Sequence, residues 1–136
     1  METIFIEIYW SDKNYCCGWG YKDVGVIMCT NKTLDGLKQE FEETLRFHIE
    51  AMVEDGEVVP QWLVDGDYNI KYTLATSAML RQAEQFTTMA AISRATGINQ
   101  RLLSNYASDV KKPRPAQREK IIAGIHAIGQ NMLGLF

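Results

Sequence analysis

The sequence has no long apolar run and no basic N-terminal segment. None of its apolar stretches approaches the roughly 20 residues that a membrane-spanning helix requires. Its first ten residues, METIFIEIYW, carry acidic side chains where an export signal would carry basic ones. We therefore expect a cytoplasmic protein without a membrane segment.

Cysteine is also scarce, and its pattern argues against two kinds of site. There are three cysteines, and Cys16 and Cys17 are adjacent. This is a poor disulfide framework, and it lacks the paired CxxC spacing of a zinc site. We expect buried thiols in a reducing compartment, and neither a metal nor a cofactor. A metal site built from Cys16, Cys29 and His48 is the alternative, although no spacing supports it.

The charge is divided unevenly along the chain. Of the 136 residues, 46% are apolar and 23% charged, which is typical of a globular protein. Residues 1–75 hold six Lys/Arg and fourteen Asp/Glu, a net charge of −8, whereas residues 76–136 hold eight and three, a net charge of +5. We therefore predict two domains, 1–75 and 76–136, of which the basic one suits nucleic acid.

The first domain is predicted to have the element order β-β-β-α-β, within an α+β chain. Strands rich in β-branched and aromatic residues are expected over 4–10, 15–20 and 24–30, the first two as an antiparallel hairpin. A long helix follows, capped by Thr33 and stopped by Gly56, and the last strand covers 68–74. The helix has one apolar stripe, formed by Leu34, Leu37, Phe41, Leu45, Ile49 and Met52.

This element order is similar to the start of an RNase H-like fold. An active enzyme of that fold needs several carboxylates that converge on a metal ion. Candidates by residue type are Glu7, Glu43, Asp65 and Asp67. We prefer the alternative that these are solvated surface acids, and we expect no enzymatic activity.

The segment from Thr33 to Pro60 carries a more specific resemblance. It reads TLDGLKQEFEETLRFHIEAMVEDGEVVP and ends in the pattern DGE-x-x-P, here Asp55, Gly56, Glu57 and Pro60. In this it resembles the HicB family of antitoxins. The resemblance implies a partial RNase H-like domain that binds and blocks a small basic HicA-like toxin, an enzyme that cleaves mRNA.

The second domain is predicted to be helical, with a sharp corner at Gly97. A helix capped by Thr76 or Ser77 is expected to run through Phe86, followed by a helix over 89–96 that Thr87 or Thr88 caps. Gly97 supplies the left-handed backbone that ends this second helix. Small Ser93 is expected to let the helices approach closely, Ile98 to fill the corner, and Asn99 to cap a third helix whose Leu102, Leu103 and Tyr106 face inward.

The third helix then presents polar side chains outward. Gln and Asn can pair with adenine and Arg with guanine, and a following basic loop suits phosphates. We predict that DNA contacts are made by Thr88, Asn99, Gln100, Arg101, Ser104, Asn105, Lys111, Lys112 and Arg114. The alternative is that these residues merely solvate a surface helix.

The stretch from Gly97 to Pro113 resembles the Cro/C1 (Xre-type) helix-turn-helix. The resemblance implies binding to operator DNA as a homo-oligomer, a dimer or larger. Asp109 occupies a turn position where such proteins commonly place glycine. A last helix is expected over 116–132 after Pro115, with its apolar face at Ile121, Ile122, Ile125 and Ile128. The apolar residues 132–136 are expected either to complete the core or to form a dimer contact.

Together the two resemblances imply the antitoxin of a HicAB-type, type II toxin–antitoxin pair. Such a protein would neutralise the toxin by direct binding and repress its own operon through the helix-turn-helix. The alternative is a stand-alone Xre-type transcriptional regulator whose first domain senses a small ligand or dimerises.

Overall fold

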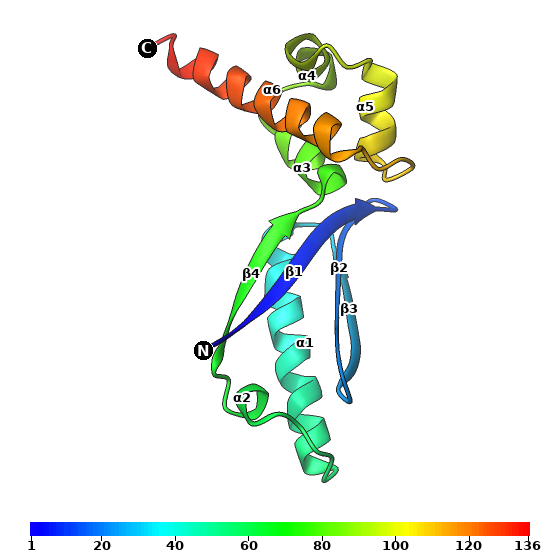
Figure 1. The fold of residues 1–136 in the computed structure, drawn as a ribbon, viewed down its shortest axis with the longest axis vertical. Coiled ribbons are helices and arrows are strands. Elements are labelled where there is room, and N and C mark those ends of the chain that lie inside the picture. The colour runs from blue at the N-terminus through cyan, green and yellow to red at the C-terminus, as the bar shows by residue number, and fades with distance from the viewer. The chain divides into compact units, whose positions relative to one another are not determined.

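The computed structural model describes residues 1–136 and is of mixed α+β class, with four strands and six helices (Figure 1). The chain divides into two compact units. Unit 1 comprises residues 1–9 and 13–74, and unit 2 comprises residues 10–12 and 75–136. The coarse class and the predicted β-β-β-α-β order are confirmed, with one short extra helix before the last strand.

Unit 1 contains a four-stranded mixed sheet with the order β3-β2-β1-β4. The strands are β1 (Glu2–Ser11), β2 (Asn14–Tyr21), β3 (Gly25–Asn31) and β4 (Tyr68–Leu74). The turn between β1 and β2 consists of Asp12 and Lys13, both with positive φ (49° and 66°). Such two-residue turns match the twist of an antiparallel hairpin. β2 and β3 pair antiparallel, whereas β4 returns alongside β1 in parallel.

Helix α1 (Leu34–Glu54) covers one face of this sheet (Figure 1). The Thr33 side chain accepts a hydrogen bond from the backbone N–H of Gly36 at 3.0 Å, and Gly56 follows the helix with φ of 75°. Both predicted ends of the helix are therefore confirmed. Its buried stripe is Leu37, Phe41, Leu45, Ile49 and Met52, while Leu34 is half-buried, and β1 contributes Ile4, Ile6 and Ile8 to the same core.

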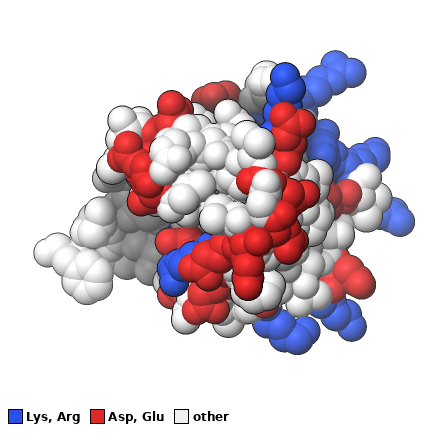
Figure 2. Space-filling view, turned by 90° about the horizontal axis from the view of Figure 1, so that it is seen from below, with Lys and Arg blue, Asp and Glu red and all other residues white.

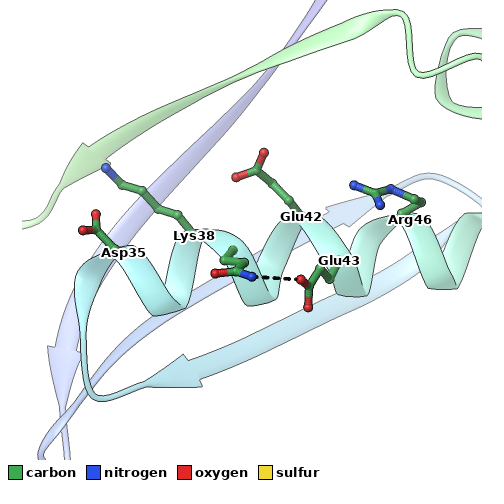
Figure 3. Close-up of a pocket in the computed structure, with 6 residues that line it drawn as sticks. Asp35, Lys38, Glu42, Glu43 and Arg46 are labelled. Atoms are coloured by element: carbon green, nitrogen blue, oxygen red, sulfur yellow. Dashed lines mark hydrogen bonds between the residues drawn. The ribbon is translucent and has the colours of Figure 1, made fainter.

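Polar contacts also tie α1 to β4. The Tyr72 hydroxyl on β4 donates to Glu42 Oε2 at 3.1 Å, and the Lys38 ammonium lies 5.2 Å from the centre of the Tyr72 ring. Burial, and then the Glu42 carboxylate, raise the pKa of Tyr72 above its ordinary value. An open hollow of about 330 Å³ lies here, and Figure 3 shows its charged side chains standing along α1. Acidic and basic side chains are interspersed along this part of α1 and do not converge on one point.

The short helix α2 (Gln61–Val64) was not predicted. Its Leu63 is buried, and its Trp62 makes edge-to-face contacts with Tyr21 and Tyr68, at 5.5 and 6.1 Å between ring centres. Four residues are too few to show a helical period. Pro60, which stands at the N-cap position, was the only local signal.

The three cysteines are buried and none forms a disulfide, as predicted. Cys17 on β2 lies opposite Cys29 on β3 and is fully buried. Burial raises the pKa of Cys17 to about 12, and burial likewise raises the pKa of Cys29. The alternative metal site is not formed, because no group of three or more His, Cys, Asp or Glu is placed to hold a metal ion. His48 instead directs Nε2 at the Val24 carbonyl oxygen, 2.5 Å away.

These thiols are expected to resist modification in the folded protein. The thiolate is the reactive form, and at pH 8 the raised pKa keeps Cys17 protonated. A chromogenic disulfide reagent at pH 8 should therefore label almost none of the cysteines in native protein and all three in denaturant. Rapid labelling of native protein would show that the strand pair β2–β3 opens readily.

Unit 2 is built from four helices around one apolar core. The helices are α3 (Thr76–Ala83), α4 (Met89–Thr96), α5 (Gln100–Ala107) and α6 (Pro115–Leu133). α6 begins with proline at its first position, where the missing N–H costs no hydrogen bond. The buried core consists of Leu80, Ala83, Ile92, Ile98, Leu103, Tyr106, Ala107 and Ile121, with Ile125 and Ile128 of α6 packed against it.

Two predictions about α3 are wrong. Ala75 occupies the N-cap position, and Thr76 and Ser77 are buried inside the helix. Their hydroxyls have other partners within unit 2: Thr76 accepts from Arg118 at 2.7 Å, and Ser77 accepts from the backbone N–H of Trp10 at 2.9 Å. The helix ends at Ala83, three residues before the predicted Phe86, whose side chain is 75% exposed.

The apolar residues at the end of the sequence lie outside the core. Met132, Leu133, Leu135 and Phe136 are all exposed. They therefore do not complete the core of unit 2, and their role as a dimer contact stays a prediction. No helix of the chain combines the length and the apolar character needed to cross a membrane.

Candidate nucleic-acid interface

A tight corner joins α4 to α5. The Thr88 side chain caps α4 by accepting from the backbone N–H of Ala91 at 3.0 Å, and Gly97 ends the helix with φ of 75°. Ser93 donates its hydroxyl proton to the Ile98 carbonyl at 2.6 Å. Ser93 is thus needed for a hydrogen bond across the turn, and not only for its small size. Ile98 is 5% exposed and fills the corner as predicted.

α5 begins directly after this corner and turns one polar face to solvent. Asn99 Oδ1 accepts from the backbone N–H of Arg101 at 2.7 Å, so the predicted cap is confirmed. Leu103 and Tyr106 are buried and Leu102 is half-buried, as expected. The outward residues Gln100, Arg101 and Ser104 are exposed, whereas Asn105 is half-buried.

The loop after α5 is held in place by its backbone. The Asn105 carbonyl accepts from the N–H groups of Val110 and Lys111, at 3.0 and 3.3 Å. Asp109 has φ of 60°, the left-handed region that its short polar side chain tolerates better than most. Asp109 therefore adopts, at this turn, the left-handed conformation that a glycine would adopt there.

This loop and the start of α6 form a hollow of about 600 Å³. It is lined by Leu102, Tyr106, Lys111, Lys112, Arg114, Ala116 and Gln117. The three cations are exposed. α6 has no side-chain cap and no acidic residue in its first turn, so its free N–H groups add partial positive charge. The sequence predicted both the cations and the helix start at Pro115, but not that they line one hollow.

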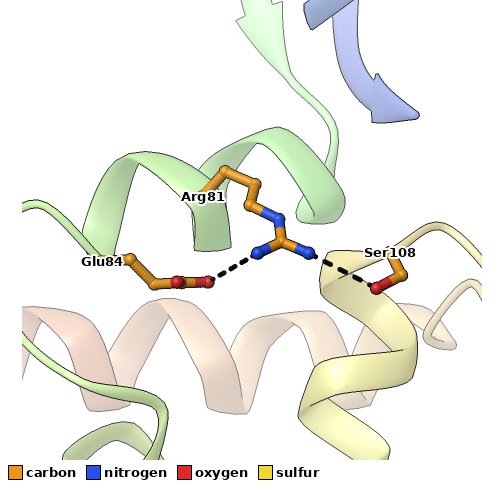
Figure 4. A network of polar contacts seen from close by, with 3 residues as sticks. All are labelled: Arg81, Glu84 and Ser108. Atoms are coloured by element: carbon orange, nitrogen blue, oxygen red, sulfur yellow. Dashed lines mark hydrogen bonds and ion pairs between the residues drawn. The ribbon is translucent and has the colours of Figure 1, made fainter. Parts of the chain in front are cut away.

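Arg81 fixes α5 from the opposite end (Figure 4). It extends from α3, and its two terminal nitrogens donate to Glu84 at 3.2 Å and to Ser108, the C-cap of α5, at 3.3 Å. Its guanidinium carbon lies 5.4 Å from the centre of the Trp10 ring, which belongs to the same unit. These contacts hold the end of α5 against α3 and so set the direction of its exposed face.

The nine predicted contact residues therefore fall into three groups. The side-chain oxygens of Thr88 and Asn99 are used as helix caps. Gln100, Arg101, Ser104 and Asn105 follow one another on α5, and Lys111, Lys112 and Arg114 line the adjoining hollow. The last two groups combine base-reading side chains with phosphate-binding cations. Their contact with DNA stays a prediction.

The acidic residues considered for nuclease chemistry do not come together. Glu7 lies on β1, and Glu43 on α1 accepts from the Gln39 amide at 3.1 Å. Asp65 and Asp67 flank the turn at Gly66, where Asp65 accepts from Gln61 at 2.8 Å. Glu7, Glu43 and this turn belong to three different parts of unit 1, and no group of three or more His, Cys, Asp or Glu is placed to hold a metal ion.

Comparison with known proteins found no relative of this chain. No protein-family model, no curated protein and no solved structure matches the chain.

Proposed function

We propose that unit 2 is an Xre-type helix-turn-helix domain that binds operator DNA. The observation that carries this proposal is the capped corner at Gly97, which leads into an α5 whose exposed face is bordered by the basic hollow. A recognition helix needs such a face to enter the major groove, and the cations then position it on the phosphates. The net charge of +5 over residues 76–136 supports the same function.

We also propose that unit 1 is a partial RNase H-like, HicB-type domain whose partner is a small basic toxin. The topology supports this through charge. The start of β1, the turn between β2 and β3, the end of α1 and the start of β4 lie at one end of unit 1. Exposed acids gather there: Glu2, Asp23, Glu54, Asp55, Glu57, Asp65 and Asp67. We call this the acidic end.

Figure 2 views unit 1 from this end and shows Asp and Glu around an uncharged area. Exposed valines contribute apolar surface to the same end, with Val58 89%, Val53 46% and Val64 41% exposed. An apolar centre with a charged rim suits a protein interface, and negative charge speeds the encounter with a basic partner. The proposed activity is therefore stoichiometric inhibition in the cytoplasm, coupled to repression of the protein's own operon.

A neighbouring gene for a small basic protein is the first observation that the proposal requires, and co-expression with that protein then tests it. The full chain should restore growth and should co-purify with that protein. Glu57→Lys at the acidic end should weaken the complex roughly ten-fold or more, because it replaces attraction by repulsion. Glu43→Lys, an equal charge change at an exposed position on α1, is the matched control and should behave like the wild type.

Two outcomes would count against the antitoxin function. If the full chain neither binds the neighbouring protein nor restores growth, the antitoxin proposal is wrong and the stand-alone regulator takes its place. If both charge variants lose binding equally, the partner does not dock at the acidic end.

A further inference from the structure

One face of the sheet in unit 1 is bare. Helix α1 packs on the face that carries Ile4, Ile6 and Ile8, and no element of unit 1 covers the opposite one (Figure 1). Three large apolar side chains stand on that opposite face, Phe5 at 68%, Val26 at 70% and Met28 at 63% exposure. We call it the outer face; its central residues are Phe5, Glu7, Gly18, Gly20, Val26, Met28, Lys71 and Thr73.

The strand register arranges these residues in two rows across the sheet. Val26 lies opposite Gly20 and Met28 opposite Gly18, while Phe5 lies opposite Lys71 and Glu7 opposite Thr73. The two-residue turn between β1 and β2 sets Phe5 opposite Gly20 and Glu7 opposite Gly18. Each row therefore consists of an apolar residue on β3, a glycine on β2, and one residue each on β1 and β4.

The two glycines make the middle of the outer face flat. A Cβ atom at Gly18 would lie 2.5 Å from Met28 Sδ, and one at Gly20 would lie 3.3 Å from Val26 Cγ2. The Met28 side chain thus packs over the backbone of Gly18, and the Val26 side chain over that of Gly20. This gives a smooth apolar surface on which the face of another sheet can pack closely.

Charge decides which partner fits this surface. Among its central residues Glu7 and Lys71 are the only charged ones, and neither forms an ion pair within the chain. The outer face is thus neutral in a segment with a net charge of −8 over residues 1–75. A basic partner is attracted to the acidic end instead. Two identical copies repel wherever like charges meet, and here opposite charges can meet.

We infer that the outer face binds the outer face of a second copy of this chain. In a two-fold interface the same patch serves both copies, so an axis that places Glu7 of one copy against Lys71 of the other also forms the reverse pair. Phe5, Val26 and Met28 then form the shared apolar centre. This inference goes beyond the proposed function and does not depend on it, because it concerns the protein alone, without DNA or toxin.

The size of the sheet sets the expected strength. Four strands about 4.8 Å apart that pair over seven residues give a face of roughly 20 by 20 Å. That flat area, about 400 Å², is below the roughly 800 Å² that a standard interface buries on each partner. The association should therefore be weak enough to depend on protein concentration.

Sedimentation equilibrium of the full chain over a hundredfold range of concentration tests this inference. The double variant Phe5→Ser, Met28→Ser should lower the average mass at every concentration at which the wild type associates. Phe47→Ser is the matched control for the Phe5 change, because Phe47 is 73% exposed but lies on α1. Circular dichroism verifies that each variant is folded, as expected for substitutions of exposed side chains.

A charge exchange makes the test specific. Glu7→Lys alone and Lys71→Glu alone should each weaken the association, and the two together should restore it, because the pairing between copies is then re-formed. The inference is overturned if the wild type is monomeric throughout, or if all these variants keep its average mass. If they keep that mass but lose binding to the basic partner, the outer face is the toxin-binding surface instead.

Discussion

Replacing Arg101 by alanine is expected to remove most of the sequence discrimination of the protein. Arg101 is exposed on α5, one residue beyond the first residue of the helix, which follows the corner cap at Asn99. An arginine in this position can bind guanine with two hydrogen bonds, a contact worth about 1–3 kcal/mol against the wrong base. Affinity for the operator should fall roughly ten- to a hundredfold, whereas affinity for random duplex DNA should change little.

Two further variants separate base reading from charge. Arg101→Lys keeps the charge but loses the planar fork of donors, so it should lose nearly as much specificity as alanine. Lys112→Ala removes a cation from the basic hollow. It should weaken binding to all sequences alike and reduce the salt dependence of log K by about one phosphate contact.

The measurement needs the operator, which can be selected from a random duplex pool with the purified protein and compared with the region upstream of the gene. Titrations at several salt concentrations then give affinity and salt slope for each variant on operator and random DNA. An equal loss on both DNAs for Arg101→Ala would show that α5 is not the recognition helix.

The features that were predicted correctly have signals within a few residues of themselves. Thr33 and Thr88 each precede a helix and accept a hydrogen bond from the backbone N–H three residues on, and Gly56 and Gly97 supply positive φ where helices end. Such local rules need no knowledge of the rest of the fold. The four strands and the apolar stripe of α1 also follow from local periodicity.

The wrong predictions depend on partners distant in the sequence. Thr76 and Ser77 have the chemistry of a cap, yet their hydroxyls accept hydrogen bonds from Arg118 and Trp10, and the helix begins at Thr76 without a side-chain cap. Tertiary contacts override local preference in this way. The strand order and the parallel return of β4 are likewise set by packing between segments and not by any single stretch.

The candidate site likewise combines features that have a local sequence signal with features that depend on residues distant in the sequence. Its exposed side chains were predicted, because they follow from the corner at Gly97 and the period of α5. The contact that orients α5, Arg81 to Ser108, joins residues 27 positions apart and has no signature in either segment. The hollow beside the loop needs the start of α6 as a wall, and only the folded chain brings it there.

The close approach of α4 and α6 at Gly124 leads to the largest expected loss of stability. Gly124 of α6 is buried, and a Cβ atom there would overlap Thr96 Cγ2 of α4. Thr96 cannot turn away freely, because its hydroxyl donates to the Ile92 carbonyl at 2.7 Å and accepts from the N–H of Ile98 at 3.1 Å. Gly124→Ala should therefore destabilise unit 2 by about 1–3 kcal/mol, typical of an overpacked core.

The higher helix propensity of alanine should by itself increase stability. A substitution at Gly129 measures this effect without overpacking. Gly129 lies in the same helix, and a methyl group added there would have no neighbouring atom within 4 Å, so Gly129→Ala should stabilise by about 0.5–1 kcal/mol. Denaturation followed by circular dichroism, with hydrogen exchange of α4 and α6 amides, measures both changes and assigns them to unit 2.

Thr96→Ser provides the decisive variant, because it removes the methyl group that meets position 124 and keeps the hydroxyl that closes the corner. Combined with Gly124→Ala, it should recover most of the lost stability, so the two changes together cost less than the sum of each alone. If Gly124→Ala instead stabilises the protein as Gly129→Ala does, α4 and α6 do not pack closely at this point. The corner that positions α5 would then rest on its own hydrogen bonds alone, and DNA affinity should be insensitive to the size of residue 124.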